Sequence, residues 1–578
     1  MSGQIDLTEY LFRRLYQLGV RSVHGVPGDY NLTALDYVSI AGLNWVGNAS
    51  ELGAGYAADG YAKIKGLSAV ITASGVGELS IINAIAGSYA EMVPVVHIVG
   101  TPPIPAQDAR LVMHHTLGDG DFRIFADMAA KITCAQASLR DPIMAIAMID
   151  ETIQQCILQS RPVYIELPTT LVRLKVSAAE LDRPINLLIP ENDTHLEEQK
   201  ASLILEKIYA AKQPFIVVDG LTSRFGFAEE VGELVRATGI ATAATPFGKG
   251  IINEHLSNFH GVYAANAGDP AFESWVHKCD LVLYFGPLMS DFNTYGFITI
   301  PERKRTIAFH RNVIEIGDER LEALRVKSFL RKVLNLIDQT KLHTNIHMEL
   351  PDPVLQLKTL PSAAPDGNID QHTFWKRISS FFRTNDVILV ESGTSSLGGS
   401  EMVLPPNTTF ITGAIWLSIG YMLGAAQGVS LALRDASKDG LRPAARTIVF
   451  EGDGSFQMTV QSISDIIRNR LDVTIFVINN DGYVIERLVH GMTAEYNDIQ
   501  PWRYLEAFSF FGAPRDDPAY PIVTRRVENW GQLNDALAED PVQQGKGLIM
   551  VEVIMGREDV PASLRRLVEG AKNRNAGP

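Results

Sequence analysis

Short runs of apolar residues, rich in valine and isoleucine, alternate with helix-like patterns along most of the chain. They lie at 69–72, 93–99, 163–167, 215–218, 281–285, 387–390, 447–450 and 473–478. An apolar run of this kind, bounded by turn residues, is typical of a strand buried on both faces, and its alternation with helices predicts βαβ units. We therefore predict an α/β fold of open, mostly parallel sheets covered by helices.

Two stretches interrupt this alternation. The first, 177–198, and the second, 340–370, are rich in proline and polar residues, which is typical of linkers between domains. A chain of 578 residues is also too long for a single hydrophobic core. We predict three domains, at 1–182, 190–345 and 365–578, of which the first and last could be copies of one architecture.

One long segment, 402–433, carries no charged residue and is long enough to span a bilayer. It is interrupted by Pro405 and Pro406, and its apolar half contains several glycines, among them Gly420, Gly424 and Gly428. We therefore favour a buried strand, turn and helix whose small residues face something bulky, and we expect no membrane partner.

The charge balance narrows the function further. The chain has 51 basic and 66 acidic residues, a formal net charge of -15, and no basic block, so we expect no nucleic-acid partner. Three scattered cysteines are too few for a disulfide framework or a zinc site and fit a reducing compartment. The first twenty residues lack the apolar stretch of a secretory signal, and we expect a cytoplasmic protein.

The strongest chemical signal follows two of the predicted strands. The run at 447–450 leads into Glu451-Gly452-Asp453-Gly454-Ser455, and the run at 473–478 ends in Asn479-Asn480-Asp481-Gly482. Ligands bind at the carboxyl ends of parallel strands. Asp453, the Asn480 amide oxygen and a free carbonyl at Gly482 are hard oxygen ligands that suit Mg²⁺ carrying phosphate.

The same loop is predicted to bind the phosphate itself. Gly454 and Ser455 open a helix whose backbone N–H groups can hold an anion. A second loop, with Ser392 and Thr394 directly after the run at 387–390, has the same character but is a weak signal alone. The alternative is that Gly-Asp-Gly is only a common turn.

The segment from Gly452 to Asn480 resembles the thiamine diphosphate and Mg²⁺ signature. The rest of the chain resembles the pyruvate decarboxylase family of 2-oxo acid decarboxylases, through 25–32, 48–52, 114–118, 290–294, 485–486 and 494–497. In that family the first domain binds the aminopyrimidine of the cofactor and the last binds its diphosphate, with the cofactor lodged between two subunits. The resemblance thus implies thiamine diphosphate, Mg²⁺, and a homodimer or homotetramer.

The resemblance also assigns roles to single residues. Glu51 is expected to hydrogen-bond a pyrimidine nitrogen and so promote removal of the thiazolium C2 proton; its alternative role, from local sequence, is a helix-capping box with Asn48. Proton transfer is assigned to Asp29, His114, His115 and Glu486. The implied cofactor-binding residues are Glu51, Ser392, Thr394, Leu417, Ile419, Gly454 and Ser455.

Some positions depart from the family pattern. Leu417 stands where the family usually has a glycine whose carbonyl meets the pyrimidine amino group, which puts the cofactor's pose or the catalytic efficiency in question. Ser392 replaces a usual threonine. The polar end of the chain, 565–578, is expected to form a mobile tail that could cover the active site.

These features imply non-oxidative decarboxylation of a 2-oxo acid through a thiamine diphosphate ylid, most simply of pyruvate to acetaldehyde and CO₂. Phe292 and Ile485 match residues that crowd the pocket in pyruvate-preferring members, which favours a small substrate. The alternatives are a decarboxylase of larger acids, such as indolepyruvate, phenylpyruvate or branched-chain 2-oxo acids, and a thiamine-binding regulatory paralogue without turnover.

Overall fold

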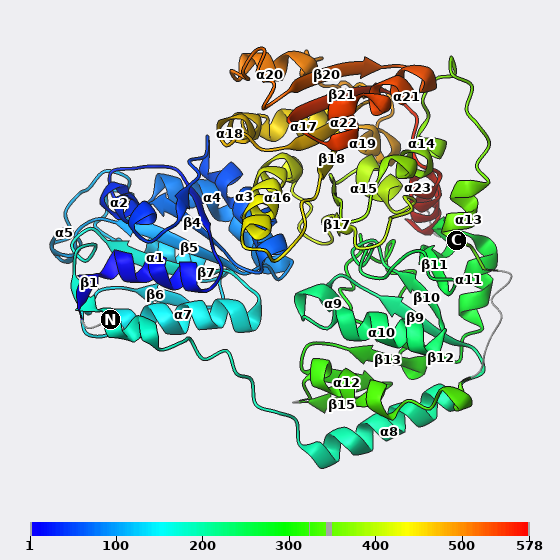
Figure 1. Ribbon diagram of the computed structural model, residues 1–578, viewed down its shortest axis with the longest axis horizontal. Helices are drawn as coiled ribbons and strands as arrows, with labels where there is room; N and C mark the ends of the chain where they lie inside the picture. Colours follow the sequence, from blue (N-terminus) through cyan, green and yellow to red (C-terminus); the bar gives the residue numbers. More distant parts are fainter. Residues whose placement is uncertain (1–2, 323, 343–349, 576–578) are drawn as a thin grey trace.

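The computed structural model describes residues 3–322, 324–342 and 350–575. It contains three large sheets, each flanked by helices and each formed by a different third of the chain (Figure 1). The first domain lies to the left in Figure 1, the middle domain at the lower right, and the third domain above it. The predicted α/β fold with mostly parallel sheets is confirmed.

The first domain is built on a parallel six-stranded sheet in the order β3-β2-β4-β5-β7-β6. A separate antiparallel pair joins β1 to β8. Its elements are β1 (Gln4–Asp6), α1 (Leu7–Gln17), β2 (Ser22–Gly25), α2 (Leu32–Ile40), β3 (Asn44–Trp45), α3 (Glu51–Lys65), β4 (Ser68–Ala73), α4 (Val76–Ala90), β5 (Val95–Thr101), α5 (Ile104–Asp108), α6 (Ile124–Ala129), β6 (Gln136–Ser138), α7 (Ala145–Gln159), β7 (Val163–Pro168) and β8 (Lys175–Ser177).

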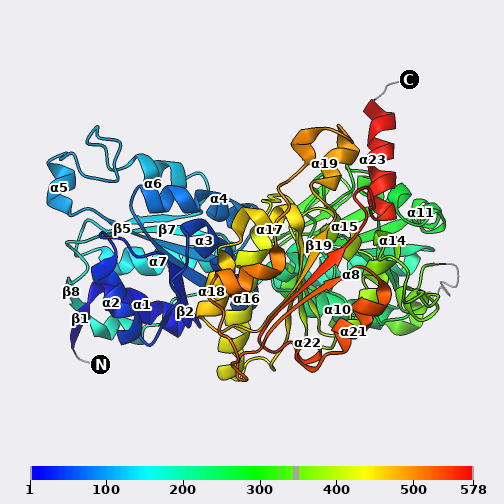
Figure 2. The ribbon, with the colours of Figure 1, turned by 90° about the horizontal axis from the view of Figure 1, so that it is seen from above.

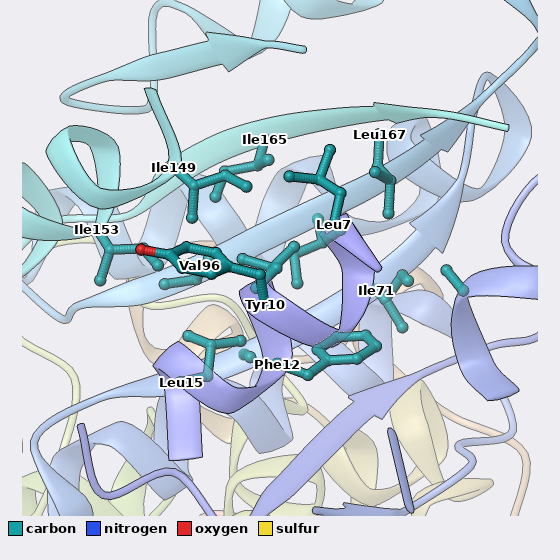
Figure 3. Close-up of a cluster of buried hydrophobic side chains, with 14 of the residues drawn as sticks. Leu7, Tyr10, Phe12, Leu15, Ile71, Val96, Ile149, Ile153, Ile165 and Leu167 are labelled. Atoms are coloured by element: carbon teal, nitrogen blue, oxygen red, sulfur yellow. The ribbon is translucent and has the colours of Figure 1, made fainter. Parts of the chain in front are cut away.

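The core of this domain shows why α1 forms a helix. Leu7, Leu11 and Leu15 recur every four residues, so they share one face, and all three are fully buried. Figure 3 shows Leu7 and Leu15 beside side chains of the sheet and of α7, among them Val96 and Ile149. Burial of this apolar face is what stabilises the helix.

The middle domain has a seven-stranded sheet in the order β11-β10-β9-β12-β13-β14-β15, and its last two strands run antiparallel to their neighbours. Its elements are α8 (Thr194–Ala210), β9 (Pro214–Val218), α9 (Leu221–Arg224), α10 (Ala228–Thr238), β10 (Ala241–Ala244), β11 (Phe259–Val262), α11 (Pro270–His277), β12 (Leu281–Phe285), β13 (Thr306–Phe309), β14 (Val313–Ile316), β15 (Glu319–Glu322) and α12 (Val326–Leu336). The short α13 (Pro353–Lys358) lies in the stretch predicted to be a linker.

The third domain has a parallel six-stranded sheet in the order β17-β16-β18-β19-β21-β20. Its elements are α14 (Gln371–Ile378), β16 (Val387–Val390), α15 (Thr394–Gly399), β17 (Thr409–Ile411), α16 (Tyr421–Lys438), β18 (Thr447–Gly452), α17 (Asp453–Thr459), α18 (Ser462–Arg468), β19 (Val473–Asn479), α19 (Val484–Val489), α20 (Ala507–Phe510), β20 (Ile522–Val527), α21 (Trp530–Ala538), α22 (Asp540–Gln544), β21 (Leu548–Ile554) and α23 (Ala562–Asn575).

The first and third domains share one strand order. If the six strands of each sheet are numbered along the chain, both sheets read 2-1-3-4-6-5 with every pair parallel. The expectation that these two parts are copies of one architecture is confirmed.

Helices α3 and α16 pack against each other and so join these two domains; both lie near the centre of the molecule in Figure 2. A Cβ atom on Gly60 would lie 2.3 Å from the Ala425 carbonyl oxygen, and one on Gly428 only 1.8 Å from that of Ala57. Such distances exclude any larger residue, so the glycines let the two backbones touch. The charge-free segment therefore contains a strand, a turn and a helix, as predicted; the helix is largely buried, but the turn exposes Ile415, Trp416 and Ile419.

Among the described residues, no helix combines the length and the apolar character that crossing a bilayer would require.

The predicted mobile tail is wrong for residues 565–575, which belong to α23; residues 576–578 lie outside the described residues. Leu564, Leu567 and Val568 recur at helical spacing and pack into a cluster that contains Tyr295. The Arg566 side chain donates a hydrogen bond to the Ala267 carbonyl, 2.8 Å away. This segment is polar overall, but its few apolar residues recur at helical spacing, and their packing determines that it forms a helix.

The close contact of α3 and α16 predicts that Gly428→Ala lowers the melting temperature, because the new methyl group meets the Ala57 carbonyl. We expect a loss of about 1–3 kcal/mol in unfolding free energy, as for other overpacked cores. Gly232→Ala in α10 is the control, since its nearest neighbour is 3.6 Å away and alanine favours helix. Equal melting temperatures of the two variants would contradict the role given to the contact.

Candidate active site

Asp453 lies at the junction of β18 and α17, where its side chain is 2% exposed. Its Oδ2 atom accepts the Gly482 backbone N–H at 2.9 Å, and its Oδ1 accepts that of Gly454 at 2.8 Å. Strands β18 and β19 are adjacent and parallel, so the loop that carries the buried Asn480 leaves the same edge of the sheet. The structure therefore brings together the three predicted metal-binding residues, Asp453, Asn480 and Gly482.

The donor set fits a divalent cation. Burial raises the pKa of Asp453 to about 6, against stabilising hydrogen bonds from backbone N–H groups. A buried carboxylate that is stabilised only by backbone N–H groups has lost its hydration, so its charged form is strongly stabilised when a cation binds. One detail of the prediction is wrong: the Gly482 carbonyl is not free, because it accepts the Val484 N–H at 3.0 Å. Its second lone pair remains available to a metal ion.

The residues predicted to hold the diphosphate follow β16 and β18, which are adjacent and parallel, at the same edge of the sheet. Only glycine fits at position 454, because a Cβ atom there would lie 2.4 Å from the Tyr483 ring. The Ser455 hydroxyl bridges the backbone N–H and carbonyl of Gly452, at 3.1 and 3.2 Å, and closes the turn that starts α17. In the loop after the neighbouring strand β16, Ser392 is half-buried, and Thr394 begins α15.

Leu417 has a backbone φ of +50°, in the left-handed region that favours glycine. A branched side chain there costs roughly 1–2 kcal/mol. Its side chain reaches toward Gly413, since a Cβ atom on that glycine would lie 3.1 Å from Leu417 Cδ2. The position that departs from the family pattern thus keeps a glycine-like backbone, and Ile419 lies exposed two residues later.

Glu51 is the first residue of α3, and Ser50 is its N-cap, accepting the Gly53 N–H at 3.2 Å. The alternative role of Glu51 in a capping box with Asn48 is therefore wrong, because the helix starts too late for that pairing. The Glu51 carboxylate lies against Gly77 in the first turn of α4, where a Cβ atom would come within 3.2 Å of Oε1.

Asp29, His114 and His115 form a cluster whose ligand-type atoms all lie within 4.8 Å of one another. The His114 Nε2 atom is hydrogen-bonded to the Asp29 carboxylate. The Tyr30 ring stacks on His114 with a centroid distance of 4.9 Å. The structure thus unites three of the four residues assigned to proton transfer, drawn from loops far apart in sequence.

The loop that carries the histidines is held by a close backbone approach. His115 has a φ of +63°, and Gly75, at the start of α4, lies so near that a Cβ atom would be 1.9 Å from the His115 carbonyl oxygen. Strained backbone of this kind is found at functional sites.

Glu486, the fourth residue assigned to proton transfer, is exposed on α19. Its neighbour Ile485 approaches the loop after β16, since a Cβ atom on Gly393 would lie 3.9 Å from Ile485 Cδ1. Among the described residues, no hydrogen bond or ion pair links the group of Glu51, Asp29 and the two histidines to the group around Asp453. In the described part of the chain the two groups are therefore not joined by a direct polar contact.

The sequence analysis missed a buried pair of acids beneath these loops. Glu391 and Glu451 follow paired residues of β16 and β18, and both are fully buried. The Glu391 carboxylate accepts the backbone N–H groups of Ser392 at 2.8 Å and Met422 at 2.9 Å. Burial raises the pKa of both carboxyl groups, and the charge of Glu391 raises that of Glu451 further. An acidic residue at the end of each apolar run was the available signal.

Models of thiamine pyrophosphate enzymes match all three domains. The N-terminal TPP binding domain matches residues 5–122, the central domain 202–337 and the C-terminal TPP binding domain 392–553. Together they cover more than half of the chain. Proteins named pyruvate decarboxylase are similar over nearly its whole length.

The relative from Aspergillus parasiticus is 45% identical and covers 98% of both chains. That from Aspergillus terreus is 42% identical, and that from Candida glabrata 40%, each over 99% of this chain and 98% of its own. The chain belongs to the pyruvate decarboxylase family of thiamine pyrophosphate enzymes. The two matched TPP binding domains are the ones built on the two sheets of equal strand order.

The Gly75 contact predicts that Gly75→Ala displaces the histidine loop, because the methyl group meets the His115 carbonyl. We expect kcat for 2-oxo acid decarboxylation to fall at least about tenfold, since small displacements of catalytic groups cost that much. Gly66→Ala is the matched control: its φ is also positive, at +85°, but nothing lies within 4 Å of the added methyl. Equal rates in the two variants would show that backbone strain alone, rather than the loop contact, determines the result.

Proposed function

We propose that this protein catalyses the non-oxidative decarboxylation of pyruvate to acetaldehyde and CO₂. The observation that carries the proposal is similarity over nearly the whole chain to proteins named pyruvate decarboxylase, among them one at 45% identity. The Asp29–His114–His115 cluster supports it, because decarboxylation without oxidation requires a proton in place of the lost CO₂.

The cofactors in this proposal are thiamine diphosphate and Mg²⁺. When bound, thiamine diphosphate supplies a nucleophilic carbon and an electron sink for the pair left by CO₂. Asp453, Asn480 and the Gly482 carbonyl would hold Mg²⁺. This assignment is supported by the buried Asp453 carboxylate, which accepts backbone N–H groups and has no ion pair with any residue that the structure describes. The contacts to the rest of the cofactor are assigned to Ser392, Thr394, Leu417, Ile419, Gly454 and Ser455.

The protein's own part is to place and move protons. Glu51 would exchange a proton with a pyrimidine nitrogen of the cofactor, and its half-buried side chain lies at the start of α3 beside Gly77. His114, oriented by its hydrogen bond to Asp29, would deliver the proton that replaces CO₂, with His115 beside it. Glu486 would face the substrate carboxylate. Exclusion of water from the site when substrate is bound would favour the loss of charge.

A small substrate is supported by bulk near the predicted reaction centre. Phe292 and Ile485 are half-buried and pack on one cluster that also contains Leu397 and Val484. Ile485 lies against the loop after β16 that carries the predicted cofactor contacts. A pocket narrowed in this way would accept the methyl group of pyruvate more readily than an aromatic side chain.

We propose a homodimer, alone or paired into a tetramer, in which the cofactor joins the first domain of one chain to the third domain of its partner. Helices α17 and α18 are nearly continuous, since Val460 and Gln461 between them keep helical backbone angles. Asp453 and Asp465 are therefore about 18 Å apart along this helix. The Glu51 loop of the same chain docks at the Asp465 end, and this arrangement leaves the Asp453 end for a second chain.

Exposed apolar side chains support the same assembly. Val76 and Leu79, in the α4 turn next to Glu51, are exposed, as are Ile419 just before α16 and Met458 near the end of α17. Apolar side chains gathered around a site are typical of an interface. We also propose the domain limits 1–182, 190–345 and 365–578, and a cytoplasmic location, which three free cysteines suit.

The test is product analysis with a panel of 2-oxo acids in the presence of thiamine diphosphate and Mg²⁺. We expect acetaldehyde and CO₂ from pyruvate, with slower turnover of phenylpyruvate, and near-complete loss of turnover in Glu51→Gln with an unchanged melting temperature. A large preference for the aromatic acid would refute the assignment of pyruvate. Binding of the cofactor without release of CO₂ from any acid would instead favour a regulatory role.

A further inference from the structure

Helix α18 presents one face to the loop that precedes Glu51. Ser462, Asp465 and Arg468 are spaced by three residues and so lie on one side of the helix. A Cβ atom on Gly53 would lie 3.2 Å from Ser462 Oγ, and one on Gly47 3.1 Å from the Arg468 guanidinium carbon. The third domain therefore contacts the first turn of α3 and the loop before it.

Asp465 forms the strongest of these contacts. Its side chain is 3% exposed, with Oδ1 accepting the Ala49 backbone N–H at 2.9 Å and Oδ2 accepting the Asn48 side-chain amide at 3.1 Å. Hydrogen bonds to a carboxylate are stronger than those between neutral groups, and more so when water is excluded. Two bonds from one carboxylate to consecutive residues fix both the position and the direction of the loop.

Asn48 transmits this restraint to the sheet. The Asn48 side-chain oxygen accepts the Gly25 backbone N–H at 3.1 Å, and the Asn48 backbone N–H donates to the Gly25 carbonyl at 2.9 Å. Gly25 ends β2, a strand whose four residues are all buried. The loop is thus held between β2 of its own domain and α18 of the third domain.

Glu51 follows this loop by two residues. Its backbone lies in the first turn of α3, whose start is defined by Ser50 as N-cap. A helix can rotate or translate as a unit, so the fixed loop, and not the cap alone, determines where the Glu51 carboxylate lies. A displacement of about 1 Å of such a group costs on the order of a hundredfold in rate.

We propose that Asp465 is a positioning residue for Glu51: through its bonds to Asn48 and Ala49 it holds the start of α3 in the place that proton exchange with the cofactor requires. The inference rests on the role of Glu51 in the proposed function. Asp465 itself contacts the loop and not the reacting atoms. It lies on α18, which is nearly continuous with the α17 that Asp453 begins, so two consecutive helices carry a proposed metal ligand and the support of Glu51.

The first experiment uses the apoenzyme and needs no cofactor. We expect Asp465→Ala to speed amide hydrogen exchange of residues 47–53 at least about tenfold, because a buried acceptor of the loop is lost. The matched control is Asp435→Ala in α16. That carboxylate is also buried between the domains and accepts the Ser22 hydroxyl at 2.7 Å and the Tyr61 hydroxyl at 3.0 Å, away from the Glu51 loop.

The second experiment follows exchange of the cofactor's C2 proton for deuterium in the loaded enzyme. We expect a fall of at least about tenfold in Asp465→Ala, a much smaller fall in Asp435→Ala, and no further fall when Asp465→Ala is added to Glu51→Gln. The KM for pyruvate should stay within about twofold while kcat falls with the exchange rate.

Three outcomes would count against these roles. Equal effects of Asp465→Ala and Asp435→Ala would reduce the contact to general domain packing and overturn the inference. Unchanged C2 exchange in Asp465→Ala, with exchange abolished in Glu51→Gln, would overturn the inference and leave the proposed function intact. Unchanged exchange in Glu51→Gln would overturn the role of Glu51 and the inference with it.

Discussion

The backbone contact between α3 and α16 is the constraint on which the rest of this structure depends. Gly60 of α3 lies against a backbone carbonyl of α16, and Gly428 of α16 lies against a backbone carbonyl of α3. A side chain at either position would not fit, so the distance between the two helices is fixed by this contact. This contact sets the first domain against the third. Two other contacts rely on it: the Glu51 loop on α18, and Trp416, whose indole N–H donates to Asn83 of α4 at 2.9 Å.

A second constraint is electrostatic. Glu391, Glu451 and Asp453 are all buried near the carboxyl ends of β16 and β18, where water cannot screen them. Glu391 is stabilised by backbone N–H groups from the loops on either side of the predicted cofactor site. Asp453 has similar partners and gains most from a cation. Burial disfavours the charged form of these three carboxyl groups. The fold therefore places acids that would gain from a nearby cation at the edge where the metal ion and the phosphate are proposed to bind.

The sequence alone predicted those features of the structure that depend on local patterns of residues. The strands, the Asp453 and Asn480 loops, and the packing role of the glycines in α16 follow from periodicity and spacing within short windows. Contacts between distant segments were not accessible in this way: Asp465 meets Ala49 across more than 400 positions of sequence, and nothing near either residue indicates the other. The occupied Gly482 carbonyl depends on the exact turn at Tyr483, which spacing alone does not determine.

The central claim is that each active site combines Glu51 of one chain with Asp453 of another. Mixing two inactive variants, Glu51→Gln and Asp453→Ala, after subunit exchange tests it directly. In a mixed dimer one site would inherit both substitutions and the other neither, so equal mixing should restore about a quarter of wild-type decarboxylation per chain. If both residues served a site within one chain, every site would stay defective, and the absence of restored activity in proven mixed dimers would contradict the account.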